Sequence, residues 1–261
     1  MPRGRRPTAT APAAPTSEAD VHHHGPTEPA QHHGSPTGDP QRIAAVWPWV
    51  RDQLAPITGP VLEVGCGPIG GFVPALLAEG RETLGVDPVA PDGPAYRQVT
   101  VEDVTPDGSF DAVVASTSLH HVRDLDALAE RLAGLLRPGG RVVVVEWAWE
   151  RIDAATVQWC FERLPEGSED SWLGRQRTAW QESGVPWDEY VRQRAVAEDL
   201  QPGAGVGRAL ASRFRTLVDE DAPYFYPYLT VDEDAERAAA ATGEIQLVGV
   251  RWVGVLDDGG L

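Results

Sequence analysis

Short apolar runs alternate with helical patterns along the chain from residue 61 onward. The run over 141–147 contains four consecutive valines, which is typical of a strand buried on both faces of a sheet. Leucines recur at helical spacing over 124–136, Asp124 can cap this helix, and Pro138, Gly139 and Gly140 are predicted to end it. The same patterns predict further strands over 61–64, 82–86, 96–101 and 111–115, and a helix over 70–79.

Strands that alternate with helices in units of this length predict an α/β fold with a parallel sheet and right-handed crossovers. Ligands of such sheets bind outside the carboxyl ends of the strands, where the strand order reverses. We therefore expect the residues that carry chemistry to lie at that edge of the sheet.

The regions on either side of this alternating pattern differ from it. Residues 41–55 predict a short amphipathic segment in which Pro48 marks a break or a helix start. Residues 148–222 contain five tryptophans and long helical patterns, which predicts an α-helical insertion that covers the site as a lid. Two strands, over 224–229 and 245–256, are expected around a short helix over 231–241.

Composition separates the first forty residues from the rest. Residues 1–40 are rich in Pro, Ala, Thr, Gly and His and contain almost no bulky apolar side chains, so we expect a disordered head before one domain over 41–261. The basic start is followed by no apolar core, which argues against a secretory signal. No run approaches the roughly 20 apolar residues of a membrane helix.

The charged and thiol residues narrow the functional classes. A net charge of −17 argues against a nucleic-acid partner, and the absence of lysine excludes a lysine Schiff base. Cys66 and Cys160 predict neither a disulfide framework nor a metal set, and favour a reducing, cytoplasmic setting. The five histidines of the head are either weak metal ligands or biased tail composition, and no spacing predicts a closed metal site.

The strongest motif is V-L-E-V-G-C-G-P-I-G, which starts at Val61. Gly65 and Gly67 follow a predicted buried strand, where a side chain would block the approach of a ligand to the backbone, and Gly70 falls where a helix begins. Asp87 lies twenty residues after Gly67, at the end of the second strand, and its carboxylate can accept hydrogen bonds from both hydroxyls of a ribose. These residues alone fit a nicotinamide-dinucleotide site equally well.

Further motifs distinguish a nicotinamide-dinucleotide site from a site for another nucleoside cofactor. Glu63 precedes the first glycine by two residues, the fourth strand reads F-D-A-V-V-A-S-T-S-L-H-H-V, and the next helix ends in L-L-R-P-G-G-R. With these motifs in this order, the stretch from Val61 to Trp147 closely resembles the class I S-adenosylmethionine-dependent methyltransferases, especially the group that includes the ubiquinone and menaquinone biosynthesis enzymes. The resemblance implies a doubly wound, Rossmann-like sheet of seven strands with the last one antiparallel.

The resemblance also implies roles for individual residues. Gly65, Cys66 and Gly67, with Glu63, would form the loop around the methionine portion of S-adenosylmethionine. Asp87 would hold the ribose hydroxyls. The remaining cofactor contacts would be Pro88 beside the adenine, Glu102 or Asp103 at the adenine amino group, and Ser116 with Thr117 near the transferred methyl group.

Two side chains near the site have alternative interpretations. His120 or His121 is either a base that removes a proton from the acceptor or a residue that starts a loop and packs against the next helix. Cys66 is either a nucleophile or a small loop residue near the cofactor. Among these groups we take His120 as the candidate catalytic residue.

The predicted insertion also has two interpretations. Its tryptophans (Trp149, Trp159, Trp172, Trp180 and Trp187) either line an aromatic or apolar acceptor pocket or pack the lid onto the core. Arg208, Arg213 and Arg215 either meet an anionic group of the acceptor or form a solvated helix face.

The sequence therefore predicts a methyltransferase that transfers a methyl group from S-adenosylmethionine to a small-molecule acceptor by direct displacement, without a metal. Two rivals stand beside it: a nicotinamide-dependent oxidoreductase with the same glycine loop, and a non-catalytic protein that binds S-adenosylmethionine. The oxidoreductase lacks support because the chain has no Tyr-x-x-x-Lys pair. The acceptor and the oligomeric state are left open.

Overall fold

The computed structural model describes residues 39–257. Almost all of the predicted disordered head, and with it the five histidines of residues 1–38, lies outside the described residues. Among residues 39–257, no helix has the length and apolar character needed to cross a membrane.

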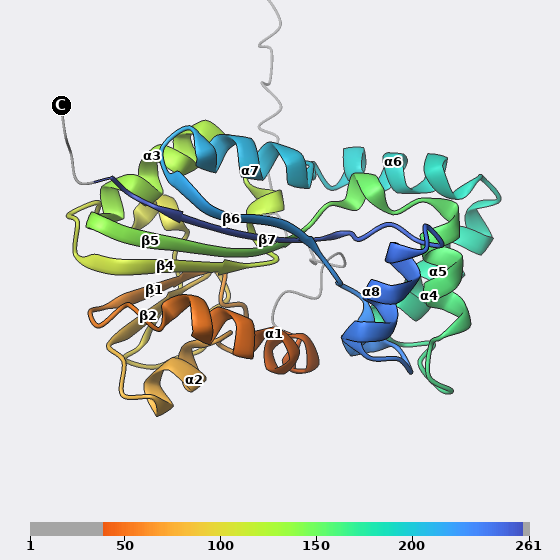
Figure 1. Cartoon of the computed structure of the whole chain (residues 1–261), viewed down its shortest axis with the longest axis horizontal. Helices are drawn as coiled ribbons and strands as arrows, with labels where there is room; N and C mark the ends of the chain where they lie inside the picture. Colours follow the sequence, from red (N-terminus) through yellow and green to blue (C-terminus); the bar gives the residue numbers. More distant parts are fainter. Residues whose placement is uncertain (1–38, 258–261) are drawn as a thin grey trace, which may run out of the picture. The chain divides into compact units, whose positions relative to one another are not determined.

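A seven-stranded sheet in the order β3-β2-β1-β4-β5-β7-β6 forms the centre of the described part (Figure 1). β1 to β5 pair in parallel, whereas β7 lies antiparallel between β5 and β6. The predicted fold class, a doubly wound sheet with its last strand antiparallel, is therefore confirmed. The strands are β1 (Val61–Val64), β2 (Thr83–Val86), β3 (Tyr96–Arg97), β4 (Phe110–Ser116), β5 (Leu136–Trp147), β6 (Arg215–Ala222) and β7 (Gly249–Val255).

Helices cover both faces of this sheet, and a group of helices lies beyond one end of it (Figure 1). The α-helices are α1 (Pro40–Leu54), α2 (Val73–Ala78), α3 (Leu125–Leu135), α4 (Ala154–Glu162), α5 (Trp172–Ser183), α6 (Trp187–Ala197), α7 (Gly203–Ala211) and α8 (Glu233–Ala241). Four short 3-10 helices complete the described elements: η1 (Val101–Asp103), η2 (Leu119–His121), η3 (Trp149–Arg151) and η4 (Tyr226–Tyr228).

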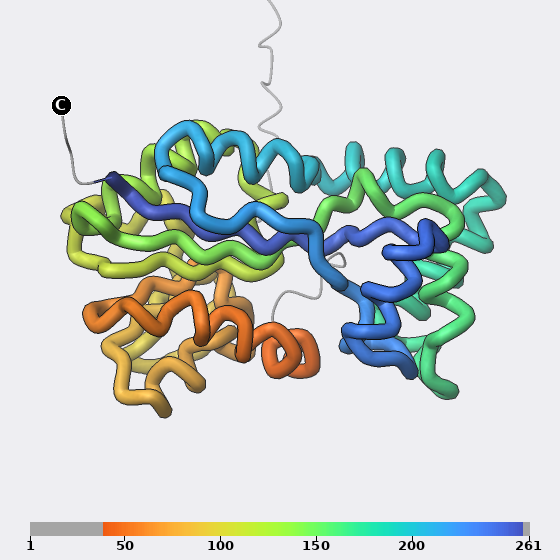
Figure 2. The backbone as a smooth tube through the Cα atoms, in the orientation of Figure 1, coloured from red at the N-terminus to blue at the C-terminus, as the bar shows by residue number. Residues whose placement is uncertain are grey.

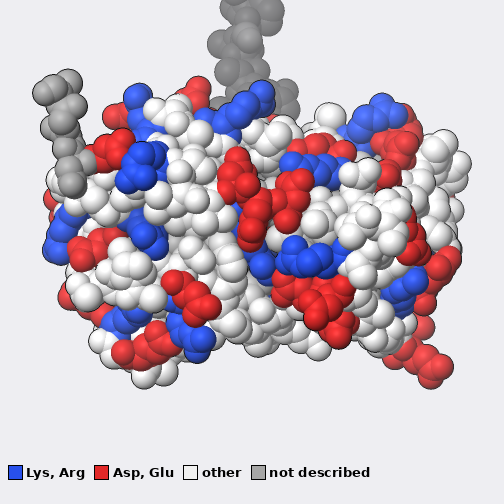
Figure 3. All heavy atoms as spheres, viewed as in Figure 1, with Lys and Arg blue, Asp and Glu red and all other residues white. Residues whose placement is uncertain are grey.

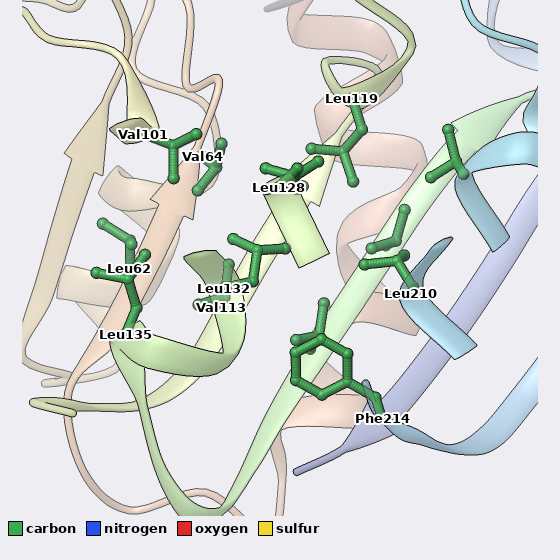
Figure 4. Close-up of a cluster of buried hydrophobic side chains, with 14 of the residues drawn as sticks. Leu62, Val64, Val101, Val113, Leu119, Leu128, Leu132, Leu135, Leu210 and Phe214 are labelled. Carbon is green, nitrogen blue, oxygen red and sulfur yellow. The ribbon is translucent and has the colours of Figure 1, made fainter. Parts of the chain in front are cut away.

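Alternate residues of each central strand pack on opposite faces of the sheet. Val142 and Val144 of β5 join leucines of α3 and α7 on one face, as the core cluster in Figure 4 shows for its labelled residues. Val143 and Val145 join α1 and α2 on the other face. A strand covered on both sides reads as a continuous apolar run, so the four valines have the burial that their pattern predicts.

α1 confirms the amphipathic segment but not the predicted effect of Pro48. Asp39 caps the helix by accepting hydrogen bonds from two backbone N–H groups of the first turn, and the helix then runs through Pro48 without a break. Val46, Val50 and Leu54 bury one stripe of α1 against the sheet. We infer that this burial offsets the roughly 3 kcal/mol that a proline costs inside a helix.

Two boundaries in the central region also differ from the predictions. The third strand ends at Arg97, and the rest of the predicted 96–101 strand leads into η1. α3 ends at Leu135, so Pro138–Gly140 do not stop it but lie at the start of β5. The N-cap prediction is confirmed, since the Asp124 carboxylate accepts a hydrogen bond from Ala127 N–H.

The C-terminal third of the chain differs most from the predicted elements. The helices after β5 end at Ala211, and residues 215–222, which were predicted as part of the helical insertion, form β6. Figure 2 shows the strand running alongside β7. The predicted strand over 224–229 is wrong as well, because Glu236 accepts the backbone N–H groups of Tyr224, Phe225 and Tyr226 and no sheet ladder forms there.

A separate apolar cluster holds the helical segment together. It joins α4, α5 and α6 to α8 and to Trp147 at the end of β5. Most of its large side chains are aromatic, and several rings pack edge to face, such as Trp180 on Trp187 at 5.5 Å between centroids. The helical segment is therefore anchored at the carboxyl edge of the sheet.

Candidate active site

A cleft lies at the carboxyl ends of β1 and β4, where the strand order reverses. It is lined by residues of α1, of the glycine loop and of the end of β4: Asp39, Arg42, Ile43, Glu63, Gly65, Cys66, Gly71, Ser116 and Thr117. Parallel strands place their ligands at such a switch point. The structure thus brings Glu63, Gly65, Cys66 and Ser116, all predicted from the sequence, into one cleft.

The buried side chain of Glu63 holds the glycine loop in place. Its carboxylate is almost fully buried and accepts hydrogen bonds from Phe72 N–H (2.8 Å) and Val73 N–H (3.0 Å) at the start of α2. A Cβ atom on Gly71 would lie 2.0 Å from Glu63 Oε1, so the loop passes directly over the carboxylate. Glu63 therefore positions the loop in this structure.

Asp87 lies at the end of β2, beside the same loop. Its Oδ2 accepts a hydrogen bond from Gly67 N–H at 3.0 Å, and its Oδ1 accepts one from Val89 N–H at 2.9 Å. The side chain remains partly exposed. A fixed carboxylate with remaining lone pairs can still accept further hydrogen bonds, as a ribose diol would require.

The other loop residues have clear steric reasons for their identity. Gly65 has a φ of +76°, and a Cβ atom there would lie 2.3 Å from Ser118 Cβ. Cys66 is fully buried, and burial raises the pKa of its thiol to about 12, with a further contribution from the Glu63 charge. Full burial and a raised pKa favour the interpretation of Cys66 as a small, packed loop residue.

The predicted adenine-side residues lie outside the cleft lining. Pro88 is exposed next to Asp87. Glu102 and Asp103 are exposed on η1, and the Asp103 carboxylate accepts a hydrogen bond from the Thr100 hydroxyl at 3.3 Å. The structure leaves both acids accessible to a ligand and does not choose between them.

Arg42 is a site residue that the sequence reasoning missed. This buried arginine of α1 lines the cleft, donates to Thr117 Oγ1 (3.2 Å) and to the Tyr224 carbonyl (3.1 Å), and stacks over the Tyr224 ring at 3.7 Å. No carboxylate of the described residues lies within salt-bridge distance of it. A single arginine at the start of a helix carries no motif, although its place on the apolar stripe with Val46 and Val50 marks it as buried.

Thr117, which also lines the cleft, has an unusual backbone conformation. It is a buried, non-glycine residue with a φ of +54°, directly after β4. Such a conformation persists only where its surroundings enforce it, and it is concentrated at functional sites. Its hydrogen bond from Arg42 ties the end of β4 to α1.

His120 pairs with a buried carboxylate. Its Nδ1 lies 2.8 Å from Glu146 Oε2, and both side chains are almost completely buried. Glu146 also accepts backbone N–H groups of Ser118, Leu119 and Trp147. Burial opposes ionisation of Glu146, but the His120 charge and these hydrogen bonds lower the pKa of the carboxyl below its usual value.

The tryptophans of the predicted insertion separate into two groups. Trp149, Trp172 and Trp187 line a second, apolar recess together with Trp147, whereas Trp159 and Trp180 pack in the helical cluster.

Arg208, Arg213 and Arg215 are exposed. Arg213 pairs with Glu130, and Arg215 pairs with Asp257. On the face drawn in Figure 3, arginine and acidic side chains are interspersed. Within residues 39–257, no three His, Cys, Asp or Glu side chains cluster as a metal site would require.

We expect Glu63 to make the stability of the protein dependent on pH. Burial raises the pKa of Glu63 to about 8, against the lowering effect of the Phe72 and Val73 N–H groups. Between about pH 4.5 and 8 the folded state therefore binds more protons at Glu63 than the unfolded state does, and the free energy of unfolding should fall as the pH rises, by up to about 1.4 kcal/mol per pH unit. Urea unfolding of the wild type and of Glu63→Gln across this range measures the effect. The variant should show a flatter profile, and equal slopes would contradict the assignment.

The comparisons with known proteins agree with this geometry. The model of a family described as a methyltransferase domain matches residues 41–181, more than half of the chain. A ubiquinone biosynthesis O-methyltransferase of Rhodopseudomonas palustris (strain BisB5) is 27% identical over 190 residues, which cover 63% of this chain and 68% of that protein.

Two solved structures share the fold. An S-adenosylmethionine-dependent methyltransferase from Mesorhizobium loti has 21% identity and a TM-score of 0.50, with 81% of this chain and 97% of that chain covered. Geranyl diphosphate C-methyltransferase from Streptomyces coelicolor, solved with S-adenosyl-L-homocysteine, has 18% identity and a TM-score of 0.50, with 82% and 79% covered.

The family match spans the glycine loop, Asp87 and the buried pair of His120 and Glu146, and the strand order places the cleft at the switch point of the sheet. The chain belongs to the S-adenosylmethionine-dependent methyltransferases, with S-adenosylmethionine as its methyl donor.

Proposed function

We propose that the protein transfers the methyl group to a small-molecule acceptor by direct displacement at the sulfonium. The observation that carries the proposal is the cleft itself, in which the glycine loop, the Asp87 carboxylate and the buried Arg42 face one space or border it. S-adenosylmethionine supplies an already activated methyl group when bound. The residues of the chain then align the acceptor with it and exclude water.

The proposed cofactor contacts come from the cleft and from residues beside it. Asp87 accepts hydrogen bonds from the ribose hydroxyls, Pro88 lies beside the adenine, and Glu102 or Asp103 accepts from its amino group. The backbone of Gly65, Cys66 and Gly67 surrounds the methionine portion, and Ser116 lies near the transferred methyl. We add Arg42 to this set, because a buried guanidinium that lines the cleft and forms no salt bridge within 4.0 Å among the described residues suits the methionine carboxylate.

His120 is the proposed base for acceptors that must lose a proton. Glu146 fixes the Nδ1 side of the imidazole, so that Nε2 is the atom that would take the proton. The side chain is fully buried in this structure and lines neither the cleft nor the apolar recess.

A small acceptor is supported by charge and by the relatives. The net charge of −17 disfavours RNA or DNA. One relative of this chain is an O-methyltransferase of ubiquinone biosynthesis, and one protein of the same fold is a geranyl diphosphate C-methyltransferase. Both buried cysteines have free thiols, which fits a cytoplasmic setting.

Replacing Asp87 with alanine should weaken the binding of S-adenosylmethionine and S-adenosylhomocysteine by about 10- to 100-fold, since two hydrogen bonds to a charged carboxylate are lost. Isothermal titration calorimetry with both sulfur compounds and with NAD measures this. Wild type should bind the first two and not NAD. Asp92→Ala removes the same charge from an exposed position nearby and should leave these affinities unchanged. Binding of NAD alone would favour the oxidoreductase instead.

A further inference from the structure

The apolar recess lies among α5, α6 and the end of β5, and it shares no lining residue with the cofactor cleft. Four tryptophans line it (Trp147, Trp149, Trp172 and Trp187), with Gln176, Arg194 and Ala195 among the other lining residues. An apolar cavity with a few polar groups is the usual form of a small-molecule site. The question is which ligand these walls and these polar groups suit.

The tryptophan walls are fixed in position. Trp149 Nε1 donates to the Gln201 carbonyl at 3.1 Å, and Trp187 Nε1 donates to the Ile152 carbonyl at 2.5 Å. Trp147 and Trp172 meet edge to face at 5.6 Å between centroids. The recess therefore offers preformed aromatic surfaces, and another aromatic ring gains more from such surfaces than its buried area alone provides.

Gln176 is a buried amide in this lining. Only 7% of the residue is exposed. Its Oε1 accepts a hydrogen bond from Tyr190 OH at 3.0 Å, and Tyr190 does not line the recess. Its Nε2 forms no hydrogen bond with another described residue. A buried amide nitrogen without an acceptor destabilises the fold, and a ligand oxygen in the recess would supply that acceptor.

Arg194 carries a charge that is already balanced. Its Nη2 lies 2.5 Å from Glu198 Oε1, one turn further along α6. A carboxylate ligand would have to compete with Glu198 for this guanidinium and would lose its hydration among the tryptophans. The recess therefore suits a neutral oxygen better than a charged one.

The recess ends next to the proposed base. Trp147 lines the recess and packs edge to face against His120, at 5.7 Å between centroids. The backbone N–H of Trp147 also donates to Glu146, which pairs with His120. A single side chain therefore lies between the recess and the imidazole.

We propose that the apolar recess binds the aromatic ring of the methyl acceptor, and that Gln176 Nε2 donates a hydrogen bond to a neutral carbonyl oxygen of that acceptor. The tryptophans supply the contacts with the ring, and a carbonyl oxygen has the lone pairs that the amide nitrogen lacks. The acceptor is thus a neutral aromatic molecule that carries a carbonyl group. This inference rests on the proposed function and specifies its acceptor.

The test uses the full chain saturated with S-adenosylhomocysteine and four probes in a ligand-observed NMR titration. Acetophenone has all the proposed features. α-Methylstyrene lacks the oxygen, cyclohexyl methyl ketone lacks the aromatic ring, and benzoate carries a charge. Acetophenone should bind at least about threefold more tightly than each of the other three.

Gln176→Met tests the hydrogen bond to the oxygen. The variant keeps a side chain of similar length but has no donor, so the preference for acetophenone over α-methylstyrene should disappear while the affinity for S-adenosylhomocysteine stays unchanged. Tyr190→Phe is the matched control. It breaks the same hydrogen bond between Tyr190 and Gln176 but keeps the amide donor, and it should retain the preference.

Ala195→Phe tests the position of the ring. Ala195 is a buried lining residue of α6, so a phenyl ring there would fill the recess and prevent the binding of acetophenone. Ala197→Phe places the same ring at an exposed position of α6 and should bind acetophenone like wild type. Both variants should still bind S-adenosylhomocysteine, which occupies the other cavity.

The location relative to the base has its own measurement. Binding of acetophenone to wild type should shift the Hε1 resonance of His120, because Trp147 contacts both the recess and the imidazole. Binding without this shift would place the ligand away from the base and overturn its assignment as the acceptor.

Absence of acetophenone binding, a comparison probe that binds as tightly, an unchanged preference in Gln176→Met, or normal binding by Ala195→Phe would also overturn the proposal. In each of these cases binding of S-adenosylhomocysteine by wild type would leave the proposed function standing. Failure of that binding would instead be a failure of the proposed function.

Discussion

Replacing Glu146 with alanine is expected to lower the free energy of unfolding by about 3 to 5 kcal/mol. The carboxylate is fully buried and accepts from Ser118 N–H and Leu119 N–H, both at 2.7 Å, and from Trp147 N–H at 3.1 Å, besides its 2.8 Å contact with His120 Nδ1. Alanine would remove the carboxylate that accepts from these groups and open a cavity in the core.

Urea unfolding followed by circular dichroism measures this loss. Glu130→Ala is the control, because that side chain is 66% exposed in its pair with Arg213 and should change the stability by less than about 1 kcal/mol. Glu146→Gln should fall between the two, since an amide oxygen can keep some of the N–H bonds. A loss below about 1 kcal/mol for Glu146→Ala would show that the turn after β4 is held by other contacts.

The same carboxyl has an effect on pH dependence opposite to that of Glu63. The pKa of Glu146 is lowered in the fold, so its contribution to stability is present above the unfolded pKa and is lost as the pH falls through the folded pKa. Acid therefore weakens the turn that carries His120, while a rise in pH toward 8 acts on the glycine loop through Glu63.

Replacing Arg42 with methionine should weaken the binding of S-adenosylmethionine and S-adenosylhomocysteine by about 100-fold or more, equal to roughly 2.7 kcal/mol. Methionine keeps much of the apolar volume of the side chain but cannot neutralise a carboxylate. 5′-Methylthioadenosine, which has the same nucleoside but no amino-acid portion, should bind wild type and variant with similar affinity.

Calorimetric titration of the three compounds separates a ligand contact from a structural role. Arg51→Met on the same helix is the control, because Arg51 is half exposed and pairs with the neighbouring Asp52, and this variant should bind like wild type. Arg42→Met should also lose some stability, since the guanidinium joins Thr117 to the Tyr224 carbonyl. An equal loss of affinity for all three compounds would indicate that Arg42 shapes the cleft without binding the carboxylate.

Much of the site was predictable because its determinants are local in the chain. Gly65 must be glycine, since its backbone adopts a positive φ and its Cα faces Ser118. Asp87 follows directly after β2, so that the pattern which predicts the strand also places the carboxylate. The conformation of such a turn is determined by residues close to it in the chain. The residue types that it requires can therefore be recognised in a single sequence.

The parts that the sequence predicted wrongly depend on distant partners. Residues 224–229 read as a strand, but Glu236 binds their N–H groups, and residues 215–222 read as helical, but they form β6 on the edge beside β7. In α1, packing against the sheet stabilises the helix, which therefore continues through Pro48 without a break. Local propensity is weaker than these tertiary contacts, so it misplaces the elements that they determine.

The chain by itself determined the alternating α/β order, the glycine loop and the position of Asp87 directly after β2, because apolar periodicity and turn chemistry act over a few residues. Only the tertiary structure decided that Arg42 meets Thr117 and Tyr224, and that His120 meets Glu146. Arg42 and Tyr224 are 182 residues apart in sequence. Contacts over such separations are selected by packing and by the requirement to partner buried polar groups, and neither leaves a local pattern in one sequence.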